Sequence, residues 1–232
     1  MTKQKSNNIS LNEINKRTLI FGGSGSGKTT IVLNDLKKSI HAGCKVIFID
    51  GRGDKVLLKE IIAYATSLGF EEEMSFTDFE VNDDIDFDKR IVVVSLPLSK
   101  LSRQEATDKS LIINEAIKRT NMVSSTSIYF DMFGFYNPGS TKEVFFHIYK
   151  KQARLILAAS DLENFNIKSL DNIDLIENFD SLIFLKQTDH LTASLALSLL
   201  NDKDTPTLTS YNELGSFKTG QGICISHLRE RR

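Results

Sequence analysis

The sequence predicts an α/β fold in which a mostly parallel sheet carries helices on both faces. Two observations lead to this prediction. Short apolar runs alternate along the chain with segments whose apolar residues recur at helical spacing, which is typical of parallel sheets covered by helices. The first apolar run, T-L-I-F at 18–21, is followed directly by the glycine-rich stretch G-G-S-G-S-G-K-T-T. This order of strand, glycine-rich loop and helix fixes the start of the fold.

The glycine-rich stretch fits a phosphate-binding loop, because Gly22, four further residues and Gly27-Lys28-Thr29 match G-x-x-x-x-G-K-[ST]. Glycines let successive backbone N–H groups point inward at phosphate oxygens. Lys28 is then expected to meet the β and γ phosphates, and Thr29 to offer its hydroxyl to magnesium. The predicted ligand is therefore ATP with Mg²⁺. The predicted contact residues are Gly22, Gly23, Ser24, Gly25, Ser26, Gly27, Lys28, Thr29 and Thr30.

The remaining elements follow from the same alternation. Further strands are predicted at 45–50, 91–96, 127–131, 155–159 and 181–185, and helices at 30–43, 55–69, 103–119, 140–151 and 190–200. The acidic segment 70–89 is predicted to be a surface connection. The segment 213–227 is predicted to form a hairpin around Thr219-Gly220 that extends the edge of the sheet.

Polar residues at the strand ends indicate where the chemistry lies. Asp50, Ser95, Asp131 and Ser160 all stand at or just after the end of a predicted strand, as the Gly22 loop does. Ligands bind at the carboxyl ends of parallel strands. We therefore expect these residues to converge on one edge of the sheet.

Composition sets the limits of the fold and its partners. The 232 residues predict a flexible arm over 1–14, a single domain over 15–228 and a basic tail over 229–232. With 29 basic and 30 acidic side chains, the net charge of -1 excludes a chain that binds nucleic acid over its whole surface. Any such contact must be local, at Arg229, Arg231 and Arg232 or at Lys150-Lys151 with Arg154. The two cysteines and the lack of a long apolar run predict a cytoplasmic protein without a membrane span.

Several stretches together resemble the FtsK–HerA superfamily of DNA-pumping ATPases, and within it the coupling proteins of conjugation and type IV secretion (the TraG/TraD kind). F-I-D-G-R-G-D resembles the second strand of that family and its D-P-K-G-D/E turn, and I-V-V-V-S-L-P-L-S resembles its strand ending in S-L-P. I-Y-F-D-M-F-G-F-Y resembles its D-E-F-G Walker B strand, with Asp131, Phe133 and Gly134 matching. The resemblance runs in family order over about residues 17–226.

The resemblance implies a RecA-like core that assembles as a homo-oligomeric ring, most often a hexamer, around DNA. It implies that Asp131 holds magnesium, that Arg154 is the arginine finger of a neighbouring subunit with Arg52 as second choice, and that Ser160 occupies the place of a sensor glutamine. The membrane anchor and the all-α domain of coupling proteins are not recognised, so membrane recruitment is expected only through partners of a secretion complex. A compact chain of this kind also resembles the genome-packaging ATPases of some membrane-containing viruses.

The Walker B strand departs from the family at one catalytic position, because Met132 stands where a glutamate deprotonates the attacking water. A thioether cannot act as a base. Three interpretations are open. Hydrolysis persists through another carboxylate such as Asp50 or Asp161; the protein binds ATP with little hydrolysis, as a scaffold or the partner of an active ATPase; or it is an unrelated P-loop kinase or GTPase. The last lacks the expected lid and base-reading motifs.

Overall fold

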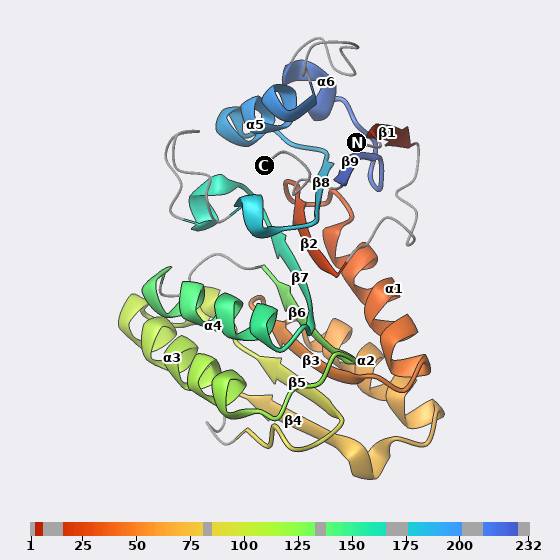
Figure 1. The fold of residues 1–232 in the computed structure, drawn as a ribbon, viewed down its shortest axis with the longest axis vertical. Helices are drawn as coiled ribbons and strands as arrows, with labels where there is room; N and C mark the ends of the chain where they lie inside the picture. The colour runs from red at the N-terminus through yellow and green to blue at the C-terminus, as the bar shows by residue number, and fades with distance from the viewer. Residues whose placement is uncertain are drawn as a thin grey trace. The chain divides into compact units, whose positions relative to one another are not determined.

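The computed structural model describes residues 3–6, 16–80, 85–132, 138–165, 176–200 and 211–226. Its contacts divide the chain into two compact units. The first unit combines Met1–Val32 with Ile156–Arg232, and the second is the continuous segment Leu33–Leu155. The boundary falls within helix α1 (Lys28–His41) and within strand β7 (Arg154–Ala159) (Figure 1).

The first unit is built on a sheet with the strand order β1-β9-β8-β2-β7. Its further elements are β1 (Lys3–Ser6), β2 (Arg17–Phe21), β8 (Ser181–Leu185), β9 (Gly222–Ser226), α5 (His190–Leu200), α6 (Tyr211–Gly215) and the 3-10 helices Leu162–Phe165 and Ile176–Asn178. β2 and β8 run parallel, with Phe21 opposite Phe184, whereas β9 is antiparallel to both β8 and β1. The antiparallel strands therefore form the edge of this sheet.

Aromatic side chains pack at the centre of the first unit. The rings of Phe21 and Phe184 stack at a centroid distance of 5.5 Å, and Phe165 meets Phe21 edge-on at 6.0 Å. All residues of β8 are buried, as is β2 from Thr18 onward. Continuous apolar runs of this kind are typical of strands covered on both faces.

The second unit contains a parallel sheet with the strand order β6-β3-β5-β4. Its elements are β3 (Lys45–Asp50), β4 (Met74–Asp78), β5 (Ile91–Ser95), β6 (Thr126–Asp131), α2 (Lys55–Ser67), α3 (Arg103–Arg119), α4 (Pro138–Lys150) and the 3-10 helices Glu71–Glu73 and Leu98–Lys100. β3 lies between β5 and β6 in register, and β4 pairs with β5 at the outer edge.

The strand order places helices on both faces of this second sheet. The connection from β3 through α2 to β4 runs outward past β5, while the connection from β5 through α3 to β6 runs back past β3. Because crossovers between parallel strands are right-handed, connections in opposite directions put α2 and α3 on opposite faces. Figure 1 shows α4 beside α3, and Lys118 of α3 forms an ion pair of 2.7 Å with Glu143 of α4.

The structure confirms the predicted α/β class, and each predicted strand and helix lies within two residues of an observed one. Two predictions were wrong. Segment 70–89 contains β4, which pairs with β5, and the edge is not a C-terminal hairpin, because α6 occupies residues 211–215 and β9 pairs instead with β8 and β1. Residues 3–6, within the predicted arm, form β1. Among the described residues, no helix has the length and apolar character needed to cross a bilayer.

Candidate phosphate-binding site and strand-end carboxylates

The loop between β2 and α1 adopts backbone conformations that its glycines permit. Gly25 and Gly27 have φ angles of +70° and +101°, in the left-handed region that disfavours other residues. Gly22 lies in a crowded position, because a Cβ there would lie 2.4 Å from the Ser26 hydroxyl oxygen and 3.0 Å from the Leu185 Cβ. The loop opens α1 at Lys28, so the strand, loop and helix of a P-loop NTPase fold are all present.

Lys28 folds back over this loop. Its side chain is buried, and the ammonium donates to the carbonyl oxygen of Gly22 and, at 3.1 Å, to that of Gly23. Thr29 is half-buried, whereas Ser24 and Thr30 are exposed. The Ser26 hydroxyl is buried and has no hydrogen-bond partner within the described part of the chain. The predicted phosphate-binding residues therefore form one compact loop.

The loop is tied to the ends of the neighbouring strands in the first unit. The Gly22 N–H donates to the Ala159 carbonyl at the end of β7 at 3.2 Å, and the Gly23 N–H donates to the Lys186 carbonyl at the end of β8 at 2.8 Å. Ser160, the expected sensor position, follows Ala159 directly and so lies beside the loop, as predicted for this strand end.

Gln187 also lies at this edge, although it was not among the predicted site residues. Its amide Nε2 donates to the Ser160 carbonyl at 2.5 Å, and its Oε1 accepts from the N–H groups of Thr188 and Asp189 at 2.8 and 2.9 Å. The side chain is buried. It thus fixes the end of β8 to the end of β7. Its place just after a predicted strand was the available signal.

The second unit brings three predicted strand-end residues into one row. Asp50 is opposite Ser95 on one side and opposite Asp131 on the other, in parallel register. All three are buried. The prediction that these residues converge on one edge is confirmed for this unit.

Asp50 is occupied by the turn that follows β3. Its carboxylate accepts from the Arg52 N–H at 2.9 Å and from the Asp54 N–H at 2.6 Å. Burial raises the pKa of the Asp50 carboxyl; the two backbone donors oppose this shift, and the charge of Asp131 adds to it. Asp161, the other alternative base, is half-buried in the first unit, and burial likewise raises the pKa of its carboxyl.

Met132 has an unusual backbone for its residue type. Its φ angle is +57°, and its N–H donates to the Asp131 carboxylate at 3.0 Å. The end of the neighbouring strand β3 packs tightly against Met132, because a Cβ on Gly51 would lie 2.8 Å from the Met132 carbonyl oxygen. Phe133 and Gly134, the other matching residues of this motif, lie outside the described residues.

Arg154 is held in a polar cluster of the second unit that joins α1, β6 and β7. Its guanidinium pairs with Asp35 at 3.1 Å and donates to the Ser39 hydroxyl at 3.2 Å. Tyr129 donates to Asp35 at 2.8 Å, and burial followed by the charge of Asp35 raises the pKa of its phenol. Arg154 begins β7, at the opposite end of the strand from Ala159.

These contacts also bear on the predicted nucleic-acid patch. Lys150 and Lys151 are exposed, whereas Arg154 is turned toward Asp35 and does not join them. The tail arginines lie outside the described residues.

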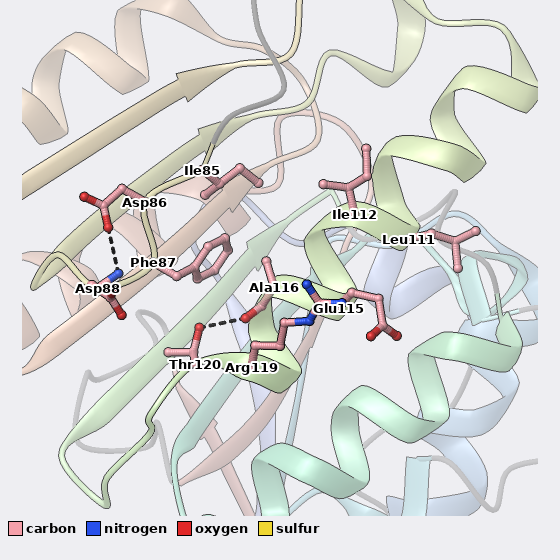
Figure 2. A pocket seen from close by; sticks show the side chains of 10 residues that line it. All are labelled: Ile85, Asp86, Phe87, Asp88, Leu111, Ile112, Glu115, Ala116, Arg119 and Thr120. Atoms are coloured by element: carbon pink, nitrogen blue, oxygen red, sulfur yellow. Dashed lines mark hydrogen bonds between the residues drawn. The ribbon is translucent and has the colours of Figure 1, made fainter.

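A cavity of about 630 Å³ lies elsewhere in the second unit, between the segment before β5 and helix α3. Figure 2 shows Phe87 and Ile85 on one side and Ile112 and Ala116 on the other, with Arg119 beside them. None of the predicted site residues lines this cavity.

Comparisons with known proteins give short similarities. A stretch of 67 residues is 30% identical to the type 4 coupling protein DotL of Legionella pneumophila subsp. pneumophila and covers 29% of this chain and 9% of that protein. A stretch of 59 residues is 36% identical to an uncharacterised protein of Mycoplasma pneumoniae and covers 25% of this chain and 49% of that protein. The matches thus span less than half the length of either relative.

No family model matches the chain. Among solved structures, the replication initiator DnaA bound to AMPPCP and single-stranded DNA is similar with a TM-score of 0.38 at 12% identity, over 90% of this chain and 53% of that one. The class assigned here, an α/β protein with a P-loop NTPase fold, therefore depends on the sheet topology and the loop described above.

Proposed function

We propose that this protein binds Mg-ATP through Gly22–Thr30. The observation that carries the proposal is the loop itself, in which glycines at positive φ and the inward-folded Lys28 stand between a buried strand and the start of a helix. Lys28 contacts the β and γ phosphates, and Thr29 supplies a hydroxyl ligand to magnesium. Asp131, at the end of its strand, is the second residue assigned to the metal.

We further propose that the bound nucleotide drives a homo-oligomeric ring, a hexamer by resemblance to coupling proteins, that moves DNA. The segment similar to a type 4 coupling protein supports this choice. The D-G-R-G-D sequence supports it as well, since the observed turn has Asp50 accepting from the N–H groups of Arg52 and Asp54. Components of a secretion complex are the expected partners. The alternative within the same superfamily is a viral genome-packaging ATPase, for which we propose the same nucleotide site and a packaging complex as the partner.

The second candidate function is a nucleotide-gated scaffold, and Met132 is the observation that favours it. Without the Walker B carboxylate, ATP binding and assembly proceed while hydrolysis slows by about a hundredfold to ten-thousandfold. Residual hydrolysis then depends on another carboxylate. Asp161 suits this role better than Asp50, since Asp161 is half-buried beside the loop strands and both oxygens of Asp50 already accept from the turn.

Calorimetric titration with ATP and magnesium tests the proposal. We expect the wild-type protein to bind with a dissociation constant in the micromolar range and Lys28→Ala to lose at least tenfold in affinity, because the ammonium is the main charge facing the phosphates. Lys59→Ala removes an exposed lysine from α2 and serves as the matched control. Absence of binding by the folded wild-type protein would refute the proposal.

A further inference from the structure

A second segment of the first unit lies against the phosphate loop. Residues Lys218–Gln221 form a turn closed by a hydrogen bond of 2.9 Å from the Gln221 N–H to the Lys218 carbonyl. Gly220 has a φ angle of +80°, as the third residue of a type II turn requires. The turn therefore has a defined shape before any ligand binds.

This turn presents two donors to the phosphate loop. The Thr219 hydroxyl donates to the Gly25 carbonyl at 3.0 Å, and the Gly220 N–H donates to the Ser26 carbonyl at 2.9 Å. The approach is close, because a Cβ on Gly27 would lie 3.2 Å from the Gly220 nitrogen. Two consecutive carbonyl groups of the loop are thus held by two consecutive residues of the turn.

The turn is anchored on both sides. Phe217 before it is buried, and Gly222 after it begins β9, where it pairs with Leu185 of β8. The Lys218 N–H also donates to the Gln221 side chain at 2.8 Å. Movement of the turn away from the loop would disturb the sheet, so the two donors stay in place.

Holding these carbonyls orients the amides on the other side of the same peptide groups. In a trans peptide, the C=O and the following N–H point in opposite directions. The carbonyls of Gly25 and Ser26 face the turn, so the N–H groups of Ser26 and Gly27 face away from it. In this structure the Ser26 N–H donates weakly to the Gly23 carbonyl, at 3.3 Å, and a bound phosphate would have to replace that acceptor. Inward-facing N–H groups at consecutive positions are what binds a phosphate in such a loop.

We propose that Thr219 and Gly220 are positioning residues that preset the phosphate loop for the phosphate groups of a nucleoside diphosphate or triphosphate. This inference rests on the proposed function and adds the residues that maintain the binding conformation. Loops held in the bound conformation lose less entropy when the ligand arrives, and affinity rises accordingly. Neither residue touches the ligand in this account.

Thr219→Val tests the inference, because it keeps the shape of the side chain and removes the hydroxyl. The affinity for a fluorescent N-methylanthraniloyl ADP with magnesium is expected to fall by about threefold to tenfold, the effect of one lost neutral hydrogen bond. Thr219→Ser restores the hydroxyl and is expected to recover the affinity. The thermal midpoint should fall by no more than a few degrees in Thr219→Val and should stay unchanged in Thr219→Ser, since Thr219 is exposed and only one hydrogen bond is lost.

Thr107→Val is the matched control. Thr107 is a partly exposed threonine of α3 whose hydroxyl donates to the Arg103 carbonyl at 2.9 Å, so the same chemical change is made in the second unit. Its nucleotide affinity should equal that of the wild type.

The outcomes separate this inference from the proposed function. If the wild type binds the probe and Lys28→Ala does not, but Thr219→Val binds like the wild type, the positioning role is overturned and the nucleotide site stands. Equal weakening in Thr219→Val and Thr219→Ser also overturns it, because the hydroxyl then makes no difference. If the wild type itself does not bind the probe, the proposed function fails.

Discussion

At the residue scale, Met132 combines a backbone constraint with a chemical substitution. It follows the buried Asp131 and adopts a left-handed conformation, which costs a residue with a Cβ roughly 1–2 kcal/mol. Glutamate at this place bears a similar cost, because it has the same unbranched Cβ as methionine. A glutamate there would therefore be no more strained than the methionine, and the two differ mainly in their chemistry.

Met132→Glu is accordingly expected to raise the rate of phosphate release by a hundredfold or more, because a carboxylate regains the role of general base. Phosphate release is measured with and without duplex DNA. Met132→Gln has the same length and no basicity, so it should stay at the wild-type rate. Equal rates in all three proteins would show that the base lies elsewhere, and Asp161→Asn would then be the next variant.

The ion pair between Arg154 and Asp35 predicts that Arg154 stabilises the fold. Arg154→Met leaves the Asp35 carboxylate buried without its cation, and we expect a loss of about 2–3 kcal/mol in the free energy of unfolding. This is less than the ~3–5 kcal/mol of a fully buried pair, because the Arg154 side chain is 26% exposed. Urea unfolding measures it, with the exposed Arg103→Met as a control expected to change by less than about 0.5 kcal/mol.

If Arg154 is instead the arginine finger, the same variant is expected to behave differently. A residue that reaches a neighbouring subunit would leave the unfolding free energy unchanged and abolish nucleotide hydrolysis. Unchanged stability with lost hydrolysis would thus favour the finger over the internal ion pair.

At the element scale, the helices were predictable and the edge strands were not. Ser102 and Glu105 form a capping box at the start of α3, and Gly43 and Gly69 terminate α1 and α2 in left-handed conformations, so local signals mark these ends. β4 and β1 carry no such signal. Phe76 of β4 is 46% exposed, and both strands exist through pairing with a partner distant in the chain, which one sequence does not reveal.

Gln152 follows α4 and adopts the left-handed conformation that Gly43 and Gly69 adopt after α1 and α2. Its φ angle is +57°, its N–H donates to the Tyr149 carbonyl, and the Ala153 N–H donates to the Ile148 carbonyl, which is the Schellman pattern. Gln152→Gly removes the Cβ strain, and we expect a gain of about 0.5–1 kcal/mol in unfolding free energy after the entropic cost of glycine. Urea midpoints measure this gain.

Gln152→Ala is the control for this prediction. Alanine keeps the Cβ, so its stability should match the wild type within about 0.5 kcal/mol. A gain of equal size in Gln152→Ala would assign the effect to loss of the glutamine side chain and contradict the backbone explanation.

At the scale of the whole molecule, the residues of the candidate site could be predicted from the sequence, whereas the contacts that hold the loop in place could not. The glycine-rich loop and the strand-end aspartates were recognised because their residue types and spacing are tied to phosphate chemistry. Gln187 and the Thr219 contact were missed, since each depends on which strand ends become neighbours.

The proposed ring gives a prediction at this scale. Sedimentation velocity should show a larger species with a non-hydrolysable ATP analogue and magnesium than without. A nucleotide that binds at a site completed by a neighbouring subunit stabilises the assembled state by mass action. Lys28→Ala should not respond to the analogue. An unchanged sedimentation coefficient in the nucleotide-bound wild type would contradict the ring and leave nucleotide binding unaffected.

The discontinuous first unit has a consequence for synthesis on the ribosome. Its opening segment up to Val32 is translated early, whereas its other part begins only at Ile156, after the entire second unit. At elongation rates of about 5–20 residues per second, the stretch between Lys28 and Gly220 takes roughly 10–40 s to emerge. During that interval the nascent glycine-rich loop lacks Ala159, Lys186, Thr219 and Gly220, the neighbours whose hydrogen bonds hold it, so the proposed nucleotide site is complete only near the end of translation.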